Sequence, residues 1–143
     1  NDNFDLNTSH VIPVLLRKFH IAKVQDLKSV EVWGTGKQRR EFLHVDDLAD
    51  AMVYLMNNYN DNYHINIGTG KDITIKELAE LIKEIVGYRG EIRFDATKPD
   101  GTPRRLLDVS KLHATGWKHK IELREGIQST YEWFKSNEKE VIK

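Results

Sequence analysis

Residues 29–58, SVEVWGTGKQRREFLHVDDLADAMVYLMNN, decide the fold class of this chain. SVEVW is rich in β-branched and aromatic residues and predicts a strand, GTGKQ predicts a turn, and residues 40–45 predict a second extended stretch. Residues 46–58 predict a helix capped by Asp46 or Asp47, and its apolar side chains cover most of its circumference. A helix of this kind needs burial on more than one side.

Helical spacing and capping signals define the elements on either side of this stretch. Apolar residues recur every three or four positions over residues 10–24, and Pro13 suits a first helical turn, where its missing N–H costs nothing. Thr74 and Glu77 predict a capping box ahead of a helix that ends at Gly87. The other expected elements are strands at 29–33, 63–70 and 91–94, a loop at 95–108, helices at 109–115 and 123–137, and a frayed tail at 136–143. This alternation of helices with short strands predicts an α/β or mixed α+β fold.

Length and composition bound the class of protein. The 143 residues predict one domain, long enough to bury a core. Basic and acidic residues number 22 each, and this balance argues against a nucleic-acid partner or an anionic membrane surface. No apolar run approaches the ~18 residues of a membrane span. The chain has no cysteine, which fits a reducing compartment, and it opens without a methionine, so we expect a piece of a longer protein.

Three motifs suggest cofactor or metal chemistry, and each has a simpler structural interpretation. GTG occurs at 34–36 and 68–70, but neither copy continues into a dinucleotide or phosphate-loop fingerprint, so we expect tight turns. Tyr131 and Lys135 have the spacing of a short-chain dehydrogenase pair, yet no phosphate loop precedes them, and we expect Tyr131 in the apolar face of a terminal helix. HVDD at 44–47 offers metal ligands, but a helix cap beside a histidine is the commoner explanation, and we predict no metal site.

Five polar residues have the chemistry that a nucleoside diphosphate requires. An indole packs on a ring, guanidinium groups fork onto phosphate oxygens, and a carboxylate accepts from sugar hydroxyls. The residues concerned are Lys18, Trp33, Arg40, Asp100 and Arg105. From the residues alone, a solvated surface with scattered charges would look similar.

A family resemblance covers nearly the whole chain, in order and with matching spacings. SHVIPVLLRKFH, VEVWGTGKQRREFLHVDDLADA, HINIGTGKDITIKELAELI, VGYRGEIRFDATKPDGTPRRLLDVSKLHATGW and STYEWF carry it. The chain resembles the C-terminal half of the GDP-L-fucose synthase family, within the extended short-chain dehydrogenase/reductase superfamily. REFLHVDDLA is shared across the superfamily, whereas KPDGTPRRLLDVSKL together with SHVIP is more specific.

The resemblance implies that residues 1–143 form the GDP-sugar-binding region and that an N-terminal Rossmann domain, absent from this sequence, binds most of NADP(H). It implies that the helix at 46–58 and the strand at 63–70 pack on that absent half. The intact protein is then expected to be a cytoplasmic homodimer, an oxidoreductase and isomerase that converts GDP-4-keto-6-deoxy-D-mannose to GDP-L-fucose. This chain alone is expected to be inactive.

The resemblance also assigns residue roles. His10 matches the family's acid/base for epimerisation at C3 and C5, which also lies near the nicotinamide; without the resemblance it would be interpreted as a surface or capping histidine. The matching GDP-sugar ligands are Lys18, Trp33, Arg40 and Asp100, with Arg105 as a looser match near the phosphates and Val11, Leu15 and Val32 at the guanine site. An imidazole suits proton transfer because its unperturbed pKa lies near neutral pH.

Two alternatives remain open at this point. The chain could belong to another NAD(P)-dependent nucleotide-sugar epimerase or dehydratase of the same superfamily. The KPDGTPRR loop and His10 argue against this alternative. It could also be a fragment that binds a nucleotide and catalyses nothing.

Overall fold

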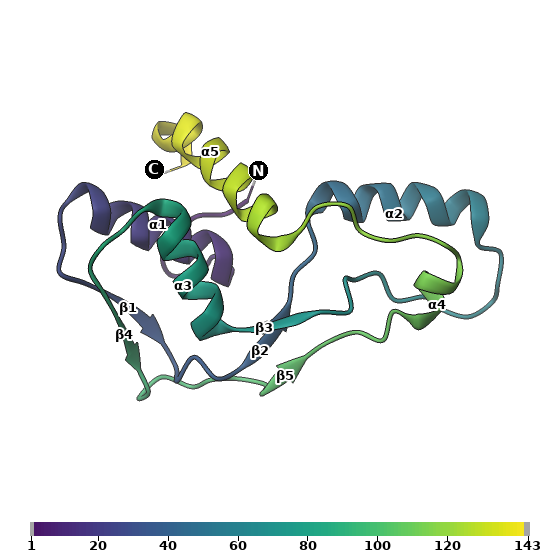
Figure 1. Cartoon of the computed structure of the whole chain (residues 1–143), viewed down its shortest axis with the longest axis horizontal. Coiled ribbons are helices and arrows are strands. Elements are labelled where there is room, and N and C mark those ends of the chain that lie inside the picture. The colour runs from purple at the N-terminus through teal and green to yellow at the C-terminus, as the bar shows by residue number, and fades with distance from the viewer. Residues whose placement is uncertain (1, 142–143) are drawn as a thin grey trace.

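The computed structural model describes residues 2–141, and its secondary structure is mixed. In chain order the elements are α1 (Val11–Val24), β1 (Ser29–Trp33), β2 (Arg39–Glu41), α2 (Val45–Asn58), β3 (Asp72–Thr74), α3 (Ile75–Val86), β4 (Glu91–Asp95), β5 (Arg104–Arg105), α4 (Ser110–Ala114) and α5 (Leu123–Val141). The predicted α/β class with mixed arrangement is confirmed (Figure 1).

The larger hydrophobic core lies between α1, α3, α5 and the parallel strand pair β1–β4 (Figure 1). Its fully buried side chains include Leu16 and Phe19 from α1, Leu78 and Ile82 from α3, and Phe134 from α5. Each such side chain stabilises the fold by roughly 1.5–3 kcal/mol relative to leaving it exposed. This core fixes α1, whose N-terminal end carries His10.

A smaller core joins α2 to α4 at the other end of the molecule (Figure 1). Ala51 and Leu55 of α2 pack with Val109, Leu112 and Trp117. The opposite face of α2 is not covered by any described residue, and Met56 there is 83% exposed. The exposed apolar side chains of this face are Val45, Leu48, Met52, Val53 and Met56. The expected burial of α2 on more than one side is therefore not met within residues 2–141.

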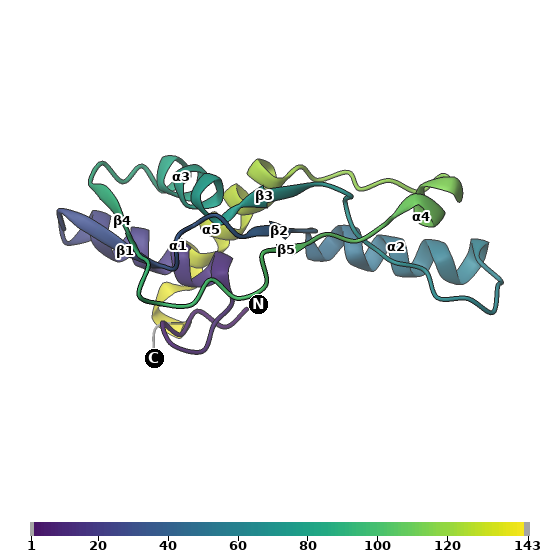
Figure 2. The same cartoon turned by 90° about the horizontal axis from the view of Figure 1, so that it is seen from below.

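A three-stranded sheet connects the two cores. Its order is β3-β2-β5, with β2 antiparallel to β3 and parallel to β5 (Figure 2). Arg39 is opposite Thr74 on β3 and Arg104 on β5, and Arg40 is opposite Arg105. β5 has only two residues and lies in the stretch predicted as loop. This sheet places the arginines of the candidate site.

Capping signals account for the ends of the helices, with one correction. The predicted capping box of α3 is confirmed, since Glu77 N–H donates to Thr74 Oγ1 at 3.1 Å and Thr74 N–H donates to Glu77 Oε2 at 2.9 Å. The prediction that an aspartate caps α2 is wrong. His44 is the N-cap, and its Nδ1 accepts from the main-chain N–H of Asp46 at 3.2 Å. Asp47 is instead buried and accepts main-chain N–H groups from Lys120 and Ile121.

Two further expectations are corrected. Residues 63–70 form no strand, because no described segment pairs with them; Ile65 and Ile67 pack against the smaller core. The tail expected to fray continues α5 to Val141, and Ile142 and Lys143 lie outside the described residues. No described helix has the length and apolarity needed to cross a membrane.

Candidate functional site

A cleft of about 710 Å³ opens between the N-terminal segment, α1, the end of β1 and the strands β2 and β5. Eight of the nine predicted site residues line it: His10, Val11, Leu15, Lys18, Val32, Trp33, Arg40 and Arg105. Asp100 is the ninth and is not among the lining residues. The structure thus brings together residues that lie up to 95 positions apart in the chain (His10 to Arg105).

His10 is the N-cap residue of α1, but its imidazole does not cap the helix. Its backbone is extended, with φ −72° and ψ 169°, and its side chain makes no capping hydrogen bond. The main-chain carbonyl of His10 accepts from the N–H of Val14 at 3.1 Å, so the backbone alone begins the helix. Pro13 sits in this first turn, as predicted. The ring is available to the cleft.

Lys18 and Trp33 form the far side of the cleft. Lys18 is eight residues beyond His10 on α1, about 12 Å along the helix axis at 1.5 Å per residue. Its Nζ donates to the main-chain carbonyl of Glu31 at 3.0 Å and lies 5.6 Å from the centre of the Trp33 ring. Burial lowers the pKa of Lys18, and the Glu31 carboxylate opposes this shift. Trp33 is 52% exposed, with a second ammonium, that of Lys98, 5.5 Å from its ring centre.

The arginines of β2 and β5 are separated by the pleat of the sheet. Successive side chains of a strand point to opposite faces, so Arg39 and Arg104 share one face and Arg40 and Arg105 share the other. On the first face, Asp72 accepts from Nε of both Arg39 and Arg104. On the second face, Arg40 and Arg105 line the cleft. Arg40 Nη1 donates to the main-chain carbonyl of Arg39 at 2.7 Å, and this bond holds its guanidinium group.

Asp100 lies beside the first GTG turn. Its carboxylate accepts from the N–H and from the hydroxyl of Thr35, each at 2.6 Å. The Thr35 hydroxyl and then its N–H lower the pKa of Asp100. Gly34 has φ +85°, and a Cβ there would collide with the Asp100 carboxylate. Asp100 therefore joins the loop between β4 and β5 to the turn that follows Trp33.

Both GTG stretches are turns, as predicted, and chain carboxylates occupy their backbone N–H groups. Asp100 accepts from Thr35 in the first turn, and Glu41 Oε1 accepts from the N–H groups of Thr69 and Gly70 in the second, at 2.6 Å each. Gly70 has φ +72°. Neither turn offers these N–H groups to a phosphate.

The apolar lining residues also belong to the core. Leu15 and Val32 are buried in the larger core, and Val11 packs against it while half-buried. Sequence reasoning missed further lining residues, among them Gln38, Phe42 and Ile75. Gln38 lies two positions before Arg40, and Phe42 lies two positions after it. The alternation of side chains along β2 would therefore have indicated both residues.

The two other chemical motifs lie elsewhere. Tyr131 is buried in the larger core, as predicted, and its hydroxyl is 3.0 Å from Nδ1 of His20, while Lys135 pairs with Glu132. His44 of the HVDD stretch caps α2. Within residues 2–141, no group of three or more histidine, aspartate or glutamate side chains is placed to hold a metal ion.

Comparisons with known proteins agree with the mixed α/β fold. The model of the NAD dependent epimerase/dehydratase family matches residues 1–68. GDP-L-fucose synthase 1 of Arabidopsis thaliana is 56% identical over 137 residues, which are 96% of this chain and 42% of that protein. GDP-L-fucose synthase of Escherichia coli (strain K12) is 52% identical over 147 residues, which cover 96% of this chain and 46% of that protein.

A solved structure extends the comparison. The crystal structure of a GDP-L-fucose synthetase from Naegleria fowleri bound to NADP superposes with a TM-score of 0.90 at 28% identity, covering 99% of this chain and 45% of that one. The chain thus spans less than half the length of these three relatives.

Proposed function

We propose that this chain, whose residues 1–68 match the model of the NAD dependent epimerase/dehydratase family, is the GDP-sugar-binding part of an epimerase-reductase of that family. The full-length protein converts GDP-4-keto-6-deoxy-D-mannose to GDP-L-fucose with NADPH. The observation that carries the proposal is the cleft in which an imidazole, an indole and three basic side chains converge. Relatives at 52–56% identity that are GDP-L-fucose synthases support it.

Arg40 and Arg105 hold the diphosphate in this proposal. Two neighbouring guanidinium groups can each fork onto phosphate oxygens, and charge-assisted bonds of this kind are the stronger hydrogen bonds of proteins. Lys18 adds a third positive charge from α1. Asp100 accepts from sugar hydroxyls in the proposal, and to do so it uses the lone pairs that Thr35 leaves free.

Trp33 and the apolar lining hold the nucleoside. The exposed indole provides a flat surface for a ring or a ribose. Val11, Leu15 and Val32 provide the apolar wall against which guanine packs.

His10 moves protons at C3 and C5 of the sugar. The keto group at C4 makes the neighbouring C–H bonds acidic, and an imidazole can take and return a proton near neutral pH. His10 lines the cleft and its ring makes no capping bond, and both features suit this role. Lys18, two turns further on α1, then faces the nucleotide end of the same substrate.

NADP(H) supplies the hydride for the keto carbon when it is bound. The residues of this chain fit only an edge of that cofactor, because the N–H groups of Thr35, Thr69 and Gly70 in the two GTG turns bond to carboxylates. We therefore assign most of NADP(H) binding to a part of the protein outside this chain, with His10 near the nicotinamide. The homodimer, the cytoplasmic location and the isomerase activity belong to the same proposal.

The test uses the full-length protein, with GDP, UDP and ADP titrations and an NADPH-oxidation assay with GDP-4-keto-6-deoxy-D-mannose. We expect GDP to bind most tightly and NADPH to be consumed only with the keto sugar nucleotide. Tighter binding of UDP would contradict the GDP-sugar assignment. Steady NADPH oxidation by the 143-residue chain alone would contradict the assignment of the cofactor to the rest of the protein.

A further inference from the structure

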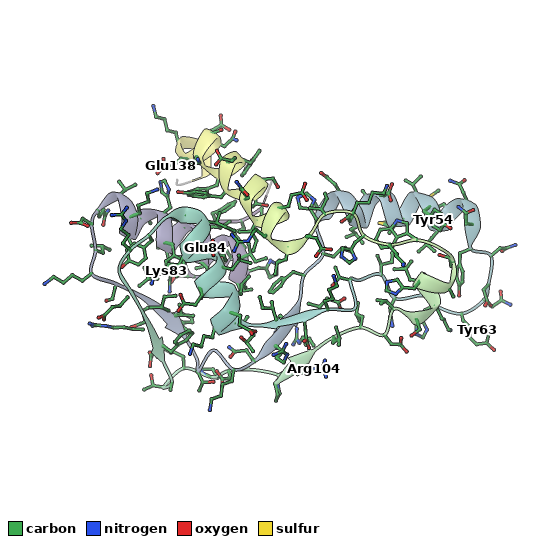
Figure 3. The ribbon with its side chains drawn as sticks, viewed as in Figure 1. Tyr54, Tyr63, Lys83, Glu84, Arg104 and Glu138 are labelled. Atoms are coloured by element: carbon green, nitrogen blue, oxygen red, sulfur yellow. The ribbon has the colours of Figure 1, made fainter. Side chains whose placement is uncertain are left out.

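Asp72 connects two strands through side chains on the face of the sheet opposite to the cleft. Its carboxylate accepts from Arg39 Nε at 2.9 Å through Oδ1 and from Arg104 Nε through Oδ2. Its main-chain carbonyl accepts from Arg39 Nη2 at 3.2 Å. The Asp72 side chain is 6% exposed, and that of Arg104 is 61% exposed. Arg104 is labelled beside β5 in Figure 3.

The clamp that Asp72 forms with Arg39 and Arg104 acts on a short strand. Two further bonds flank that strand: the Arg39 N–H donates to the Pro103 carbonyl at 2.8 Å, and Glu41 Oε2 accepts from the Leu107 N–H at 2.9 Å. β5 consists of two residues, Arg104 and Arg105, and it pairs only with β2. A slip of one residue would turn Arg105 away from the cleft and bring Arg104 into it, because the side chains of a strand alternate between the faces. Arg40 and Arg105 are also like charges on facing positions, an arrangement that favours separation of the two strands.

We propose that Asp72 is a positioning residue for the anion site: by holding Arg39 and Arg104 together, it keeps Arg40 and Arg105 side by side in the cleft. This inference rests on the proposed function, in which those two arginines bind the diphosphate. It assigns Asp72 no contact with the substrate. The hydrogen bond from Arg104, followed by that from Arg39, lowers the pKa of Asp72, so the clamp carries its negative charge at neutral pH.

The sign of one mutational effect separates this role from a simple charge effect. Replacing Asp72 by Asn removes a negative charge near four arginines, and electrostatics alone would then strengthen the binding of an anion. If Asp72 instead positions the arginine pair, the same substitution weakens that binding. The weakening falls mainly on the second phosphate, because the guanine and ribose contacts come from other elements.

The experiment measures GDP and GMP dissociation constants of the full-length protein and its Asp72→Asn variant. We expect the GDP affinity to fall roughly 10-fold, as for the loss of one charge-assisted hydrogen bond, and the GMP affinity to change less. In an Arg105→Ala background, Asp72→Asn should leave the ratio of GDP to GMP affinity unchanged. Glu84→Gln is the matched control, since it breaks another carboxylate–arginine pair, with Arg124, on a different surface.

The results of this experiment distinguish a failure of the proposed function from a failure of the positioning role of Asp72. If the wild-type protein does not prefer GDP to GMP, the proposed function fails. If it does, and Asp72→Asn binds GDP as well as or better than the wild type, the positioning role is overturned while the proposed function stands. Should Asp72→Asn not fold, the exposed Arg104→Gln replaces it, with Arg93→Gln as an equal-charge control; an equal GDP-to-GMP ratio in these two variants would also overturn the role.

Discussion

Arg40 and Arg105 occupy facing positions on the parallel strands β2 and β5, and both line the same cleft. Their neighbours Arg39 and Arg104 form ion pairs with Asp72 on the opposite face of the sheet. No carboxylate among residues 2–141 forms an ion pair with Arg40 or Arg105. Two adjacent guanidinium groups without a carboxylate partner are suited to an external anion that carries more than one charge.

Replacing Arg40 by Ala should weaken GDP binding by the full-length protein. Loss of charge-assisted hydrogen bonds costs roughly 1.5–3 kcal/mol, which is on the order of 10- to 100-fold in the dissociation constant. Arg40→Lys should recover only part of the affinity, because an ammonium group cannot make the planar two-point contact. Isothermal titration with GDP measures both.

Arg93→Ala is the control for this prediction, since Arg93 is an exposed arginine on β4 that pairs with Glu91 outside the cleft. It should leave GDP affinity unchanged. If the Arg40→Ala variant binds GDP as tightly as the wild type, Arg40 is a solvated surface residue and does not bind the diphosphate.

Local signals in the sequence predicted local structure well. The capping box of α3 and its end at Gly87 are correct, because both depend on residues within one helix. The sequence did not reveal β5, since two arginines in a proline- and glycine-rich loop carry no strand signal and pair only because β2 lies beside them. The error at 63–70 has the same origin, because an apolar extended segment becomes a strand only beside a partner.

The candidate site was predicted by resemblance rather than by pattern. Chemistry alone left scattered surface charges as an equal interpretation of Lys18, Arg40 and Arg105. Their convergence depends on the register of β2 and β5 and on the packing of α1, and neither can be read from residue types. Asp72 carried no signal at all, because its partners lie 33 and 32 positions away in the sequence.

The acid stability of the protein should depend on Asp72. Its pKa is lowered in the folded state, chiefly by the Arg104 hydrogen bond, so its ionised form stabilises the fold above the unfolded pKa, which is about 3.9. That stabilisation is lost as the pH falls through the lower folded pKa. The difference in free energy of unfolding between wild type and Asp72→Asn should therefore be larger at pH 7 than below pH 4, as measured by urea unfolding. Glu91→Gln, in an exposed pair, should show little such difference, and a pH-independent gap for Asp72→Asn would contradict the prediction.

Gly34→Ala should destabilise the turn beside Trp33. The left-handed backbone costs a residue with a Cβ about 1–2 kcal/mol, and the added Cβ would also collide with the Asp100 carboxylate that holds Thr35. Thermal unfolding should show a lower Tm, with weaker GDP binding as well. Gly87→Ala has a similar φ of +74° but meets only the end of Lys23 at 3.4 Å, so its loss should be smaller and should leave GDP binding unchanged. Equal effects of the two substitutions would mean that the contact with Asp100 is unimportant.

His10→Gln separates the two reactions that share the proposed site. Glutamine keeps polarity and approximate size but cannot be protonated near neutral pH, and loss of a general acid/base costs about 10²–10⁴-fold in rate. GDP binding, which depends on Trp33 and Arg40, should change far less. We therefore expect a full-length variant that folds and binds GDP and NADPH, but exchanges the C3 and C5 protons of the keto sugar with deuterated water at least 100-fold more slowly, as followed by NMR. Exchange at the wild-type rate would mean that His10 is only the N-cap residue of α1 and that the general acid/base comes from another part of the protein.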